Sequence, residues 1–461
     1  MPDRPENPPS EPSEPPSPAT HGSGAAPDPP PPPTSSSSPP PPSSPPPSPT
    51  AAPQPPRGAR LEPTTKGERE PILDVLRGFA LLGILFVNIE FMRGSDLYGA
   101  LFGLAVEAPP TPADQATSFL VGWLISGKFV SAFSIMFGIG AALIARRALD
   151  AGRSPRGLLA RRYAWLMGFG LAHMLLLFPG DVLLVYGITG MVLLAFITKP
   201  PATLLRWSGG LLLVTTLVYT LVAVTAGAAV MDPSADDAFT TFALGQQERA
   251  LEVYAEGSYG QLIGVNAFLA LLIQSGQLSL LPWFLALFLF GFVLGRSGLV
   301  HDLRARQDLL RRAAVVGLGV GLPANLVMGW LGPLGAGTSA TPRWVEVAGA
   351  AAQLGGAPVL AVGYLATLTL ICLRWGPIRP LAAVGRMALS AYLLQSLLAL
   401  VVFFGLGFYD QLGATEALTV VAGIWVAVIV VSILWMRHFR FGPAEWLWRS
   451  LTYGRLQPLR R

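Results

Sequence analysis

The sequence predicts an all-α integral membrane protein: a polytopic bundle of about ten transmembrane helices, preceded by a disordered tail rich in proline and serine. Composition and charge spacing support this prediction. Hydrophobic residues make up 51% of the 461 positions and charged residues only 13%, and the mean hydropathy is +0.50. The charges cluster between apolar runs of roughly 20 residues, the length that crosses the hydrocarbon core of a bilayer.

Segment 1–70 differs in composition from the rest of the chain. Proline runs such as 29–33 and 39–42 alternate with serine, and large apolar side chains are almost absent. Such a segment cannot bury enough surface to offset its chain entropy, so we expect a disordered, partly polyproline cytoplasmic tail. It contains no apolar stretch of the signal-peptide type, so the first membrane helix is expected to act as an uncleaved signal anchor. Alternatively, this segment has a function and is a ligand for a proline-recognition domain.

Basic residues orient the first five predicted spans. The first span, at about 72–91, begins beside basic residues, which places its start and the N-terminus in the cytoplasm. A second helix ends at Arg146 and Arg147, and the short loop after it adds four more arginines, so this loop is cytoplasmic too. Three further spans follow at about 160–177, 182–198 and 207–230, with an external turn at 179–181.

The second half of the predicted domain, 71–461, begins with an acidic external loop at 231–261. Two apolar pieces, 262–273 and 280–294, then precede the basic cluster 296–312. Because that cluster is expected in the cytoplasm, the number of crossings between must be odd, and the short first piece either lies in the interface or re-enters. The remaining spans are expected at about 313–331, 345–373, 381–406 and 418–436, followed by a short cytoplasmic tail at 437–461.

Charge and cysteine content exclude several other classes. The net charge of +5 comes from Lys and Arg residues beside apolar spans, where the positive-inside rule explains them without a nucleic-acid partner. Cys372 is the single cysteine, so an intramolecular disulfide, a redox pair and a cysteine-metal site are all excluded. The four histidines are scattered along the chain, and we expect no metal site.

The first span carries three polar residues, Asp74, Arg77 and Asn88, within the apolar run LDVLRGFALLGILFVNI. On a helix, Asn88 lies within about 20° of Arg77 in azimuth and roughly 16 Å further along. Polar groups in this position are costly in lipid and often functional. The alternative is an ordinary ion pair at the helix start and a hydrogen bond from Asn88 to a neighbouring helix.

Other polar residues are predicted at a similar depth. His173 lies roughly 18 Å beyond the start of its span, Asp181 follows in the external turn, and Lys128 is about 26 Å from the cytoplasmic side. Together they favour a convergent cluster, because an imidazole beside a carboxylate can take a proton from an attacking hydroxyl or amine. Each also has a structural explanation: a histidine bonded between helices, a lysine that snorkels outward, and an aspartate that caps the fourth span.

Five ordered motifs after residue 70 resemble one family of membrane proteins. They are LDVLRGFALLGILFVNI, KFVSAFSIMFGIGAAL, GLAHMLLLFPGDVLLVYGITG, GRMALSAYLLQSLL and FGPAEWLWRSLTYGRLQPLRR. The chain resembles the YeiB family of bacterial inner-membrane proteins, whose C-terminal part is commonly filed as a domain of unknown function. The resemblance implies a multi-pass protein of the bacterial plasma membrane. The charge pattern adds that both termini are cytoplasmic.

The opening motif is also distantly similar to membrane acyltransferases, including the lysosomal enzyme that acetylates the glucosamine ends of heparan sulfate. It is similar as well to the group of membrane acyltransferases that O-acylate surface sugars. In these O-acylating relatives the arginine matched by Arg77 lies near the cytoplasmic donor side, and a histidine stands at the position of Asn88. Because an amide cannot act as a general base, His173 is expected to be the base, with Asp181 orienting it. Asn88 would then donate to the developing oxyanion.

The residues expected to bind the donor are Asp74, Arg77, Arg386 and Gln395, and Lys128 is a further polar membrane site. Simple positive-inside anchoring is the alternative role for Arg77 and Arg386. Acyl-CoA is the expected co-substrate, with no permanently bound cofactor.

Three functions are compatible with this sequence. The first is an acyltransferase that moves an acyl group from cytoplasmic acyl-CoA to a hydroxyl or amine of an external saccharide or lipid, with membrane lipids as surroundings. The second is a transporter or exporter whose pathway uses the same polar residues. The third is a scaffold that recruits partners through its proline-rich tail. The sequence contains no convincing internal repeat, which favours the enzyme over the transporter.

Overall fold

The computed structural model describes residues 71–102, 109–229, 237–335 and 341–460, together with Pro29. These residues form helices and no β-strand; their one isolated β-bridge joins Phe439 to Arg460. The all-α prediction is therefore confirmed. The predicted disordered tail, apart from Pro29, and residues 231–236 of the predicted acidic loop lie outside the described residues.

Seven helical stretches are long and apolar enough to cross a membrane. They comprise α1 (Pro71–Arg93), α3 (Pro112–Leu124) with α4 (Lys128–Asp150), α7 (Pro201–Ala229), α9 (Tyr259–Ser279), α13 (Arg343–Ala351) with α14 (Ala357–Trp375), α16 (Ala388–Leu400) with a π-helical turn, and α17 (Ala414–His438). Two shorter apolar helices are α6 (Leu183–Leu193) and α10 (Leu281–Arg296). The remaining helices are α2 (Asp96–Phe102), α5 (Pro155–Leu176), α8 (Asp237–Glu256), α11 (Gln307–Ala324), α12 (Met328–Leu331), α15 (Arg379–Arg386) and α18 (Pro443–Tyr453). This arrangement confirms the membrane class.

The apolar surface of α7 also fits a lipid environment. Its outward side chains include Leu213, Leu217 and Leu221, which are 59%, 58% and 61% exposed. Exposed leucines at this spacing form a continuous apolar stripe, which a water-soluble surface rarely tolerates. Hydrocarbon is therefore the natural surroundings of this helix.

Several predicted spans are interrupted helices. The helix at 345–373 contains a π-helical segment at Ala352–Gly356, and the span predicted at 381–406 is divided at Met387 into α15 and α16. A short turn at 125–127 separates α3 from α4, where Gly127 has a φ of 80° that favours glycine. These breaks matter because α16 carries part of the site described below.

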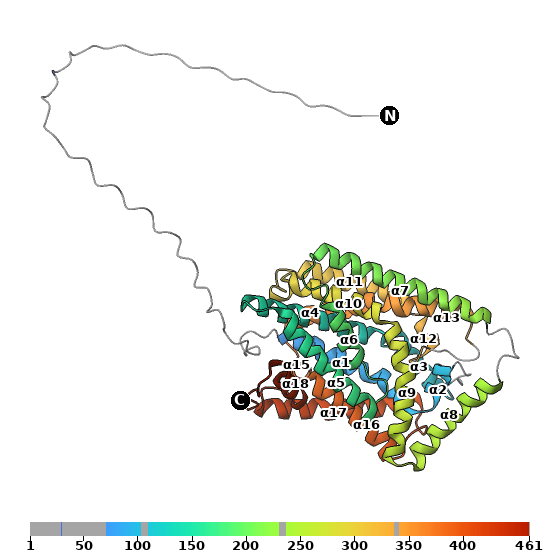
Figure 1. The fold of residues 1–461 in the computed structure, drawn as a ribbon. Helices are drawn as coiled ribbons and strands as arrows, with labels where there is room; N and C mark the ends of the chain where they lie inside the picture. Colours follow the sequence, from blue (N-terminus) through green and yellow to red (C-terminus); the bar gives the residue numbers. More distant parts are fainter. Residues whose placement is uncertain (1–28, 30–70, 103–108, 230–236, 336–340, 461) are drawn as a thin grey trace, which may run out of the picture. The chain divides into compact units, whose positions relative to one another are not determined.

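Helix α9 contains the short apolar piece 262–273 and is longer than the sequence suggested. Its first residue, Tyr259, donates a hydrogen bond to the Leu176 carbonyl, and Gln274 near its other end donates to the Asp181 carbonyl. Leu176 is the last residue of α5 and Asp181 lies in the connection to α6, so α9 passes beside this end of both helices. Figure 1 shows α9 crossing the direction of α7 and α17. With 21 residues α9 is long and apolar enough to cross a membrane, so the expectation of a short, interfacial or re-entrant piece stays a prediction. The predicted acidic loop before it contains a helix, α8, rather than an extended loop.

The helices of the bundle pack around α1, which lies against α4, α15, α16 and α17. Its side chains from Leu73 to Ile89 supply much of the large hydrophobic core. The start of α1, α15, α18 and the described C-terminus gather at one end, whereas α2, α3 and α8 lie toward the other (Figure 1). We call the first of these ends the basic end, because Arg77, Arg147, Arg162 and Arg386 all lie there.

Candidate functional site

His173 and Asp181 form a fully buried pair at the connection between α5 and α6. Their side chains are shielded completely, and His173 Nδ1 lies 2.8 Å from Asp181 Oδ1. Residues 177–182 reverse the chain direction between the two helices, which brings position 181 beside position 173. Gly170 permits this approach, because a Cβ there would lie 2.4 Å from Leu184 N and 2.8 Å from Asp181 Oδ2.

Asp181 performs two roles with its two oxygens. Oδ1 accepts from His173, while Oδ2 accepts the backbone N–H of Leu184 at 2.8 Å, in the manner of a helix cap at the start of α6. The side chain therefore makes both predicted contacts at once, one with His173 and one with the start of the next helix. Because the carboxylate can only accept, it holds the imidazole proton on Nδ1 and leaves the Nε2 lone pair free to accept.

Ser396 and Tyr392 of α16 complete the surroundings of His173. Ser396 Oγ lies 2.9 Å from His173 Nε2, and with this tautomer the hydroxyl donates. The Tyr392 ring packs against the imidazole with centroids 4.8 Å apart. Sequence reasoning missed both residues: they lie more than 200 positions from His173, and a serine or tyrosine within an apolar helix carries no distinctive signal.

Asn88 reaches the same cluster from α1. Its side chain is partly buried, and the Tyr392 hydroxyl lies close to it and to Asp181. That hydroxyl is buried and makes no hydrogen bond of ordinary geometry to the described residues. Asn88 and His173, which the sequence placed at a similar depth, therefore share one neighbour, Tyr392.

A cavity of about 270 Å³ extends from the basic end toward this cluster. Its inner wall includes Val182, Tyr186 and Tyr392, which adjoin the His173–Asp181 pair, and apolar side chains such as Leu81 and Phe137 line its middle. His173, Asp181 and Ser396 do not line the cavity, whereas Tyr392, whose ring packs against His173, does. The volume is close to the lower end of the range of small-molecule sites, about 300–1,000 Å³.

The outer part of this cavity is strongly basic. Five arginines line it, with two carboxylates and one histidine: Arg77, Arg147, Arg162, Arg386, Arg449, Asp74, Glu445 and His301. Asp74 pairs with Arg77 at 3.1 Å, the contact that the sequence offered as the structural alternative to donor binding. The surplus of guanidinium groups makes this mouth complementary to an anionic ligand. We refer to the whole feature as the arginine-lined cavity.

Helix α18 closes one side of the arginine-lined cavity, although the sequence suggested only a short tail there. The Arg162 guanidinium lies 3.5 Å from the centroid of the Trp448 ring, and the Trp448 indole N–H donates to the Arg162 carbonyl at 2.8 Å. Both residues line the cavity. The last helix of the chain is thus part of the candidate site.

Two of the predicted polar residues lie away from this cavity. Lys128 is completely buried and donates to the Gly122 carbonyl at 2.9 Å, so it caps the end of α3 instead of snorkelling outward. Gln395 is 1% exposed, and neither its amide nitrogen nor its oxygen has a hydrogen-bond partner among the described residues. It therefore does not join Asp74, Arg77 and Arg386 at the cavity wall.

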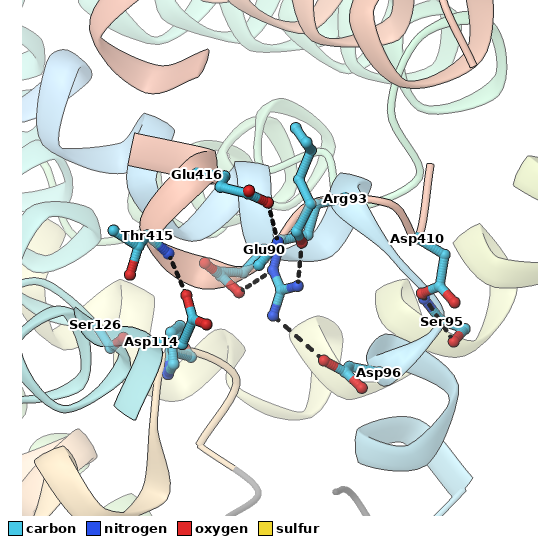
Figure 2. Close-up of polar contacts among 12 residues, drawn as sticks. Glu90, Arg93, Ser95, Asp96, Asp114, Ser126, Asp410, Thr415 and Glu416 are labelled. Carbon is cyan, nitrogen blue, oxygen red and sulfur yellow. Dashed lines mark hydrogen bonds and ion pairs between the residues drawn. The ribbon is translucent and has the colours of Figure 1, made fainter. Parts of the chain in front are cut away.

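A second polar cluster lies at the opposite end of α1 (Figure 2). Arg93 Nε donates to Glu90 at 2.6 Å, while its terminal nitrogens contact Asp96 Oδ2 and the Leu412 carbonyl. Asp114 of α3 accepts from the backbone N–H of Thr415 at 2.8 Å. These contacts bind the ends of α1, α3 and α17 to one another, which is a structural role.

The fold and site define a helical membrane protein in which a buried aspartate–histidine–serine network adjoins the inner end of an arginine-lined cavity. A family model described as "Protein of unknown function (DUF418)" matches residues 294–455. The chain is 30% identical over 417 residues to "Uncharacterized protein YxaH" of Bacillus subtilis (strain 168), an alignment that covers 87% of this chain and 98% of that protein. It is 31% identical over 399 residues to "Uncharacterized protein YeiB" of Escherichia coli (strain K12), covering 84% and 96% respectively.

The chain belongs to the YeiB family, as its five motifs indicated. A third relative, "Uncharacterized 39.9 kDa protein in amylase 3'region" of Bacillus acidopullulyticus, is 26% identical over 406 residues, which is 87% of this chain and 98% of that protein. The three alignments cover 84–87% of this chain.

Proposed function

We propose that this protein is a transmembrane acyltransferase that takes an acyl group from an anionic thioester, of the acyl-CoA type, and transfers it to a hydroxyl or amine. The observation that carries the proposal is the arginine-lined cavity, which joins a basic mouth to the neighbourhood of His173. A thioester with a phosphorylated carrier needs a site that has a charged part and an apolar part. Its phosphates require guanidinium groups and its acyl chain requires an apolar interior.

The arginines give the donor its direction. Arg77 and Arg386 come from α1 and α15, and Arg162 comes from α5, so phosphate groups at the mouth would be held from three helices. In that position the pantetheine arm and acyl chain point inward, toward Tyr392. A cavity of about 270 Å³ accommodates this inner portion while the nucleotide stays at the mouth.

His173 is the general base in this proposal. The Asp181 carboxylate fixes the proton on Nδ1, so Nε2 can take a proton from an attacking hydroxyl or amine. The Asp181 charge also stabilises the imidazolium that forms. Asn88, beside Tyr392, supplies an amide donor for the negative charge that develops on the thioester oxygen.

The sidedness of the reaction follows from the charge pattern. Lys and Arg beside membrane spans favour the cytoplasm, so in this proposal the basic end and both termini face the cytoplasm and the membrane is the bacterial plasma membrane. The donor would then enter from the cytoplasm, and the acceptor, a saccharide or lipid, would approach from the outer side.

Calorimetric titration of the purified full-length protein with acetyl-CoA and palmitoyl-CoA tests the proposal. We expect binding of at least one thioester, weakened roughly ten- to hundredfold by Arg77→Ala, because one charge-assisted contact contributes about 1.5–3 kcal/mol. Arg311→Ala is the matched control, since Arg311 also pairs with an aspartate three positions away but lies outside the cavity.

The same preparation should release CoA thiol when simple saccharide hydroxyls and amines, such as glucosamine, are supplied. His173→Ala should abolish this release while membrane insertion is retained. If neither thioester binds to the wild-type protein, the proposal is wrong. If full turnover persists in His173→Ala, the histidine is not the base.

A transporter is the second candidate, favoured by two buried amide side chains. Gln395 and Asn266 are each 1% exposed, and neither has a hydrogen-bond partner among the described residues. Unpartnered amides inside a membrane bundle are costly unless a polar solute or water contacts them. Uptake of a labelled anion into proteoliposomes, without any thioester turnover, would favour this function over the acyltransferase.

A further inference from the structure

Several hydroxyls buried in the helices bond within their own helix, whereas the Ser396 hydroxyl contacts a side chain of a different helix. Ser131, Ser134, Thr189 and Thr369 each donate to the carbonyl four residues earlier, which is the ordinary solution for a hydroxyl inside a helical bundle. Among the described residues, the one partner of Ser396 Oγ is His173 Nε2. The hydroxyl proton is therefore placed on the lone pair of a histidine whose other nitrogen is fixed by a carboxylate.

We propose that Ser396 is the nucleophile of this protein and carries the acyl group as a covalent serine ester. The inference rests on the proposed acyltransferase function and gives it a two-step course. Three side chains from separate elements form the chain Asp181–His173–Ser396, with heavy-atom distances of 2.8 and 2.9 Å. This is the arrangement that activates a hydroxyl in serine hydrolases and transferases on unrelated folds.

In the first step Ser396 Oγ attacks the thioester carbonyl carbon, and its proton passes to His173 Nε2. The carbon–sulfur bond then breaks, and the departing thiolate takes the proton back from Nε2 as a thiol. In the second step the acceptor hydroxyl or amine attacks the serine ester and gives its proton to Nε2. The bond to Ser396 Oγ breaks, and the serine recovers that proton from His173.

Tyr392 controls access in this scheme. It lines the arginine-lined cavity, whereas Ser396 does not, and its ring packs against His173. A thioester at the inner end of the cavity reaches Ser396 only after this ring moves. Tyr392 and Ser396 are four positions apart on α16 and so share one helix face, which makes the ring a direct barrier to the hydroxyl.

An alkyl fluorophosphonate tests the nucleophile without knowledge of the acceptor. This reagent forms a stable ester with an activated serine, which peptide mass spectrometry locates. We expect the full-length protein to be labelled at Ser396, and Tyr392→Ala to be labelled faster because the barrier is removed. Ser396→Ala should lose the label. His173→Gln should slow labelling at least about 100-fold, since it removes the base but keeps hydrogen-bonding capacity.

Ser432→Ala is the matched control, because Ser432 is also fully buried in a helix and has no described hydrogen-bond partner. It should be labelled as the wild type is. Absence of label at Ser396 in both the wild type and a monodisperse Tyr392 variant overturns the proposal, as does equal labelling of His173→Gln.

Thioester assays on Ser396→Ala separate this inference from the function on which it rests. Loss of turnover with retained acetyl-CoA binding supports the covalent course. Undiminished turnover would mean direct transfer to the acceptor, so the serine ester would be wrong while the acyltransferase function stands. If the wild type binds no thioester but Ser396 is labelled, the nucleophile stands and the thioester donor is wrong.

Discussion

Glu445 and Ser390 join the last helix of the chain to the helix that carries Ser396. The Ser390 hydroxyl donates to Glu445 Oε2 at 2.5 Å, and the backbone N–H groups of Leu389 and Ser390 donate to Oε1. These N–H groups belong to the first turn of α16, where a helix has no internal acceptors for them. Glu445 therefore caps α16 from another helix, and α18 helps to fix the helix that positions Tyr392 and Ser396.

Removal of the Glu445 carboxylate should destabilise the protein. Glu445→Ala leaves the buried N–H groups of Leu389 and Ser390 without a partner, which we expect to cost about 2 kcal/mol or more. Glu445→Gln should cost less, because its amide oxygen can still accept from the first turn of α16. Thermal unfolding in detergent measures both variants. If the two substitutions have equal effects, the capping role is wrong.

The stability contribution of Glu445 should depend on pH. Burial raises the pKa of its carboxyl above the ordinary value of 4.5, and the hydrogen bonds from Ser390 and Leu389 oppose this less strongly. The folded state then binds the proton more tightly than the unfolded state. The free energy of unfolding therefore falls as pH rises from about 4.5 to the raised folded pKa, and is level below and above this window.

Unfolding of the wild type and Glu445→Gln across this pH range isolates the effect, because the glutamine does not titrate. We expect the difference in unfolding free energy, wild type minus variant, to fall as pH rises through the window. A difference that rises with pH would mean that Glu445 is stabilised as a carboxylate.

Asp181→Asn should impair the candidate site more than the fold. The amide oxygen can still cap α6 at Leu184, but its NH₂ group then faces His173 and donates to Nδ1. This favours the tautomer with the proton on Nε2, which leaves Nε2 no lone pair to accept a proton. We expect fluorophosphonate labelling and thioester turnover to fall by about 10²- to 10⁴-fold. Unfolding temperature should change little. Wild-type rates in this variant would exclude an orienting role for Asp181.

Close packing between α1 and α15 should make Gly385 sensitive to a methyl group. A Cβ at Gly385 would lie 1.8 Å from the Asp74 carbonyl oxygen, so Gly385→Ala must push α15 away from α1. We expect a loss of about 1–3 kcal/mol in unfolding free energy and weaker acetyl-CoA binding, because Arg386 moves with α15.

Gly423→Ala is the control for this packing, since a Cβ there meets no atom within 4 Å. It lies in α17 and should be neutral or slightly stabilising, as alanine favours a helix by up to about 1 kcal/mol. Equal effects of the two substitutions would show that helix propensity, and not the contact between α1 and α15, decides the result.

The sequence predicted the helices better than their interruptions. The predicted first span, 72–91, differs from α1 by only one or two residues at each end, because apolar length and flanking charge determine a membrane helix. The π-helical segment at 352–356 and the break at Met387 have no comparable signal in hydropathy. The path of α9 across the bundle depends on contacts with Leu176 and Asp181, which are tertiary.

The candidate site was predictable where its members are close in sequence. His173 and Asp181 lie eight positions apart across a recognisable turn, and their pairing followed from that turn. The contact of Ser396 with His173 was not predictable, since it joins α16 to α5 across more than 200 positions of the sequence. Lys128 was expected either in a polar cluster or snorkelling outward; the second alternative is wrong, because the break after α3 offers its ammonium group a buried carbonyl acceptor.

The orientation of the arginine-lined cavity is testable by cysteine labelling. Arg153 is exposed in the turn between α4 and α5, at the basic end. In a Cys372→Ser background, Arg153→Cys should react with a membrane-impermeant maleimide only after the cells are opened, because the positive-inside rule places this turn in the cytoplasm. A cysteine at Thr415, at the opposite end of the bundle, should react in intact cells. Labelling of position 153 from outside would invert the topology and place the donor site on the external face, where acyl-CoA is absent.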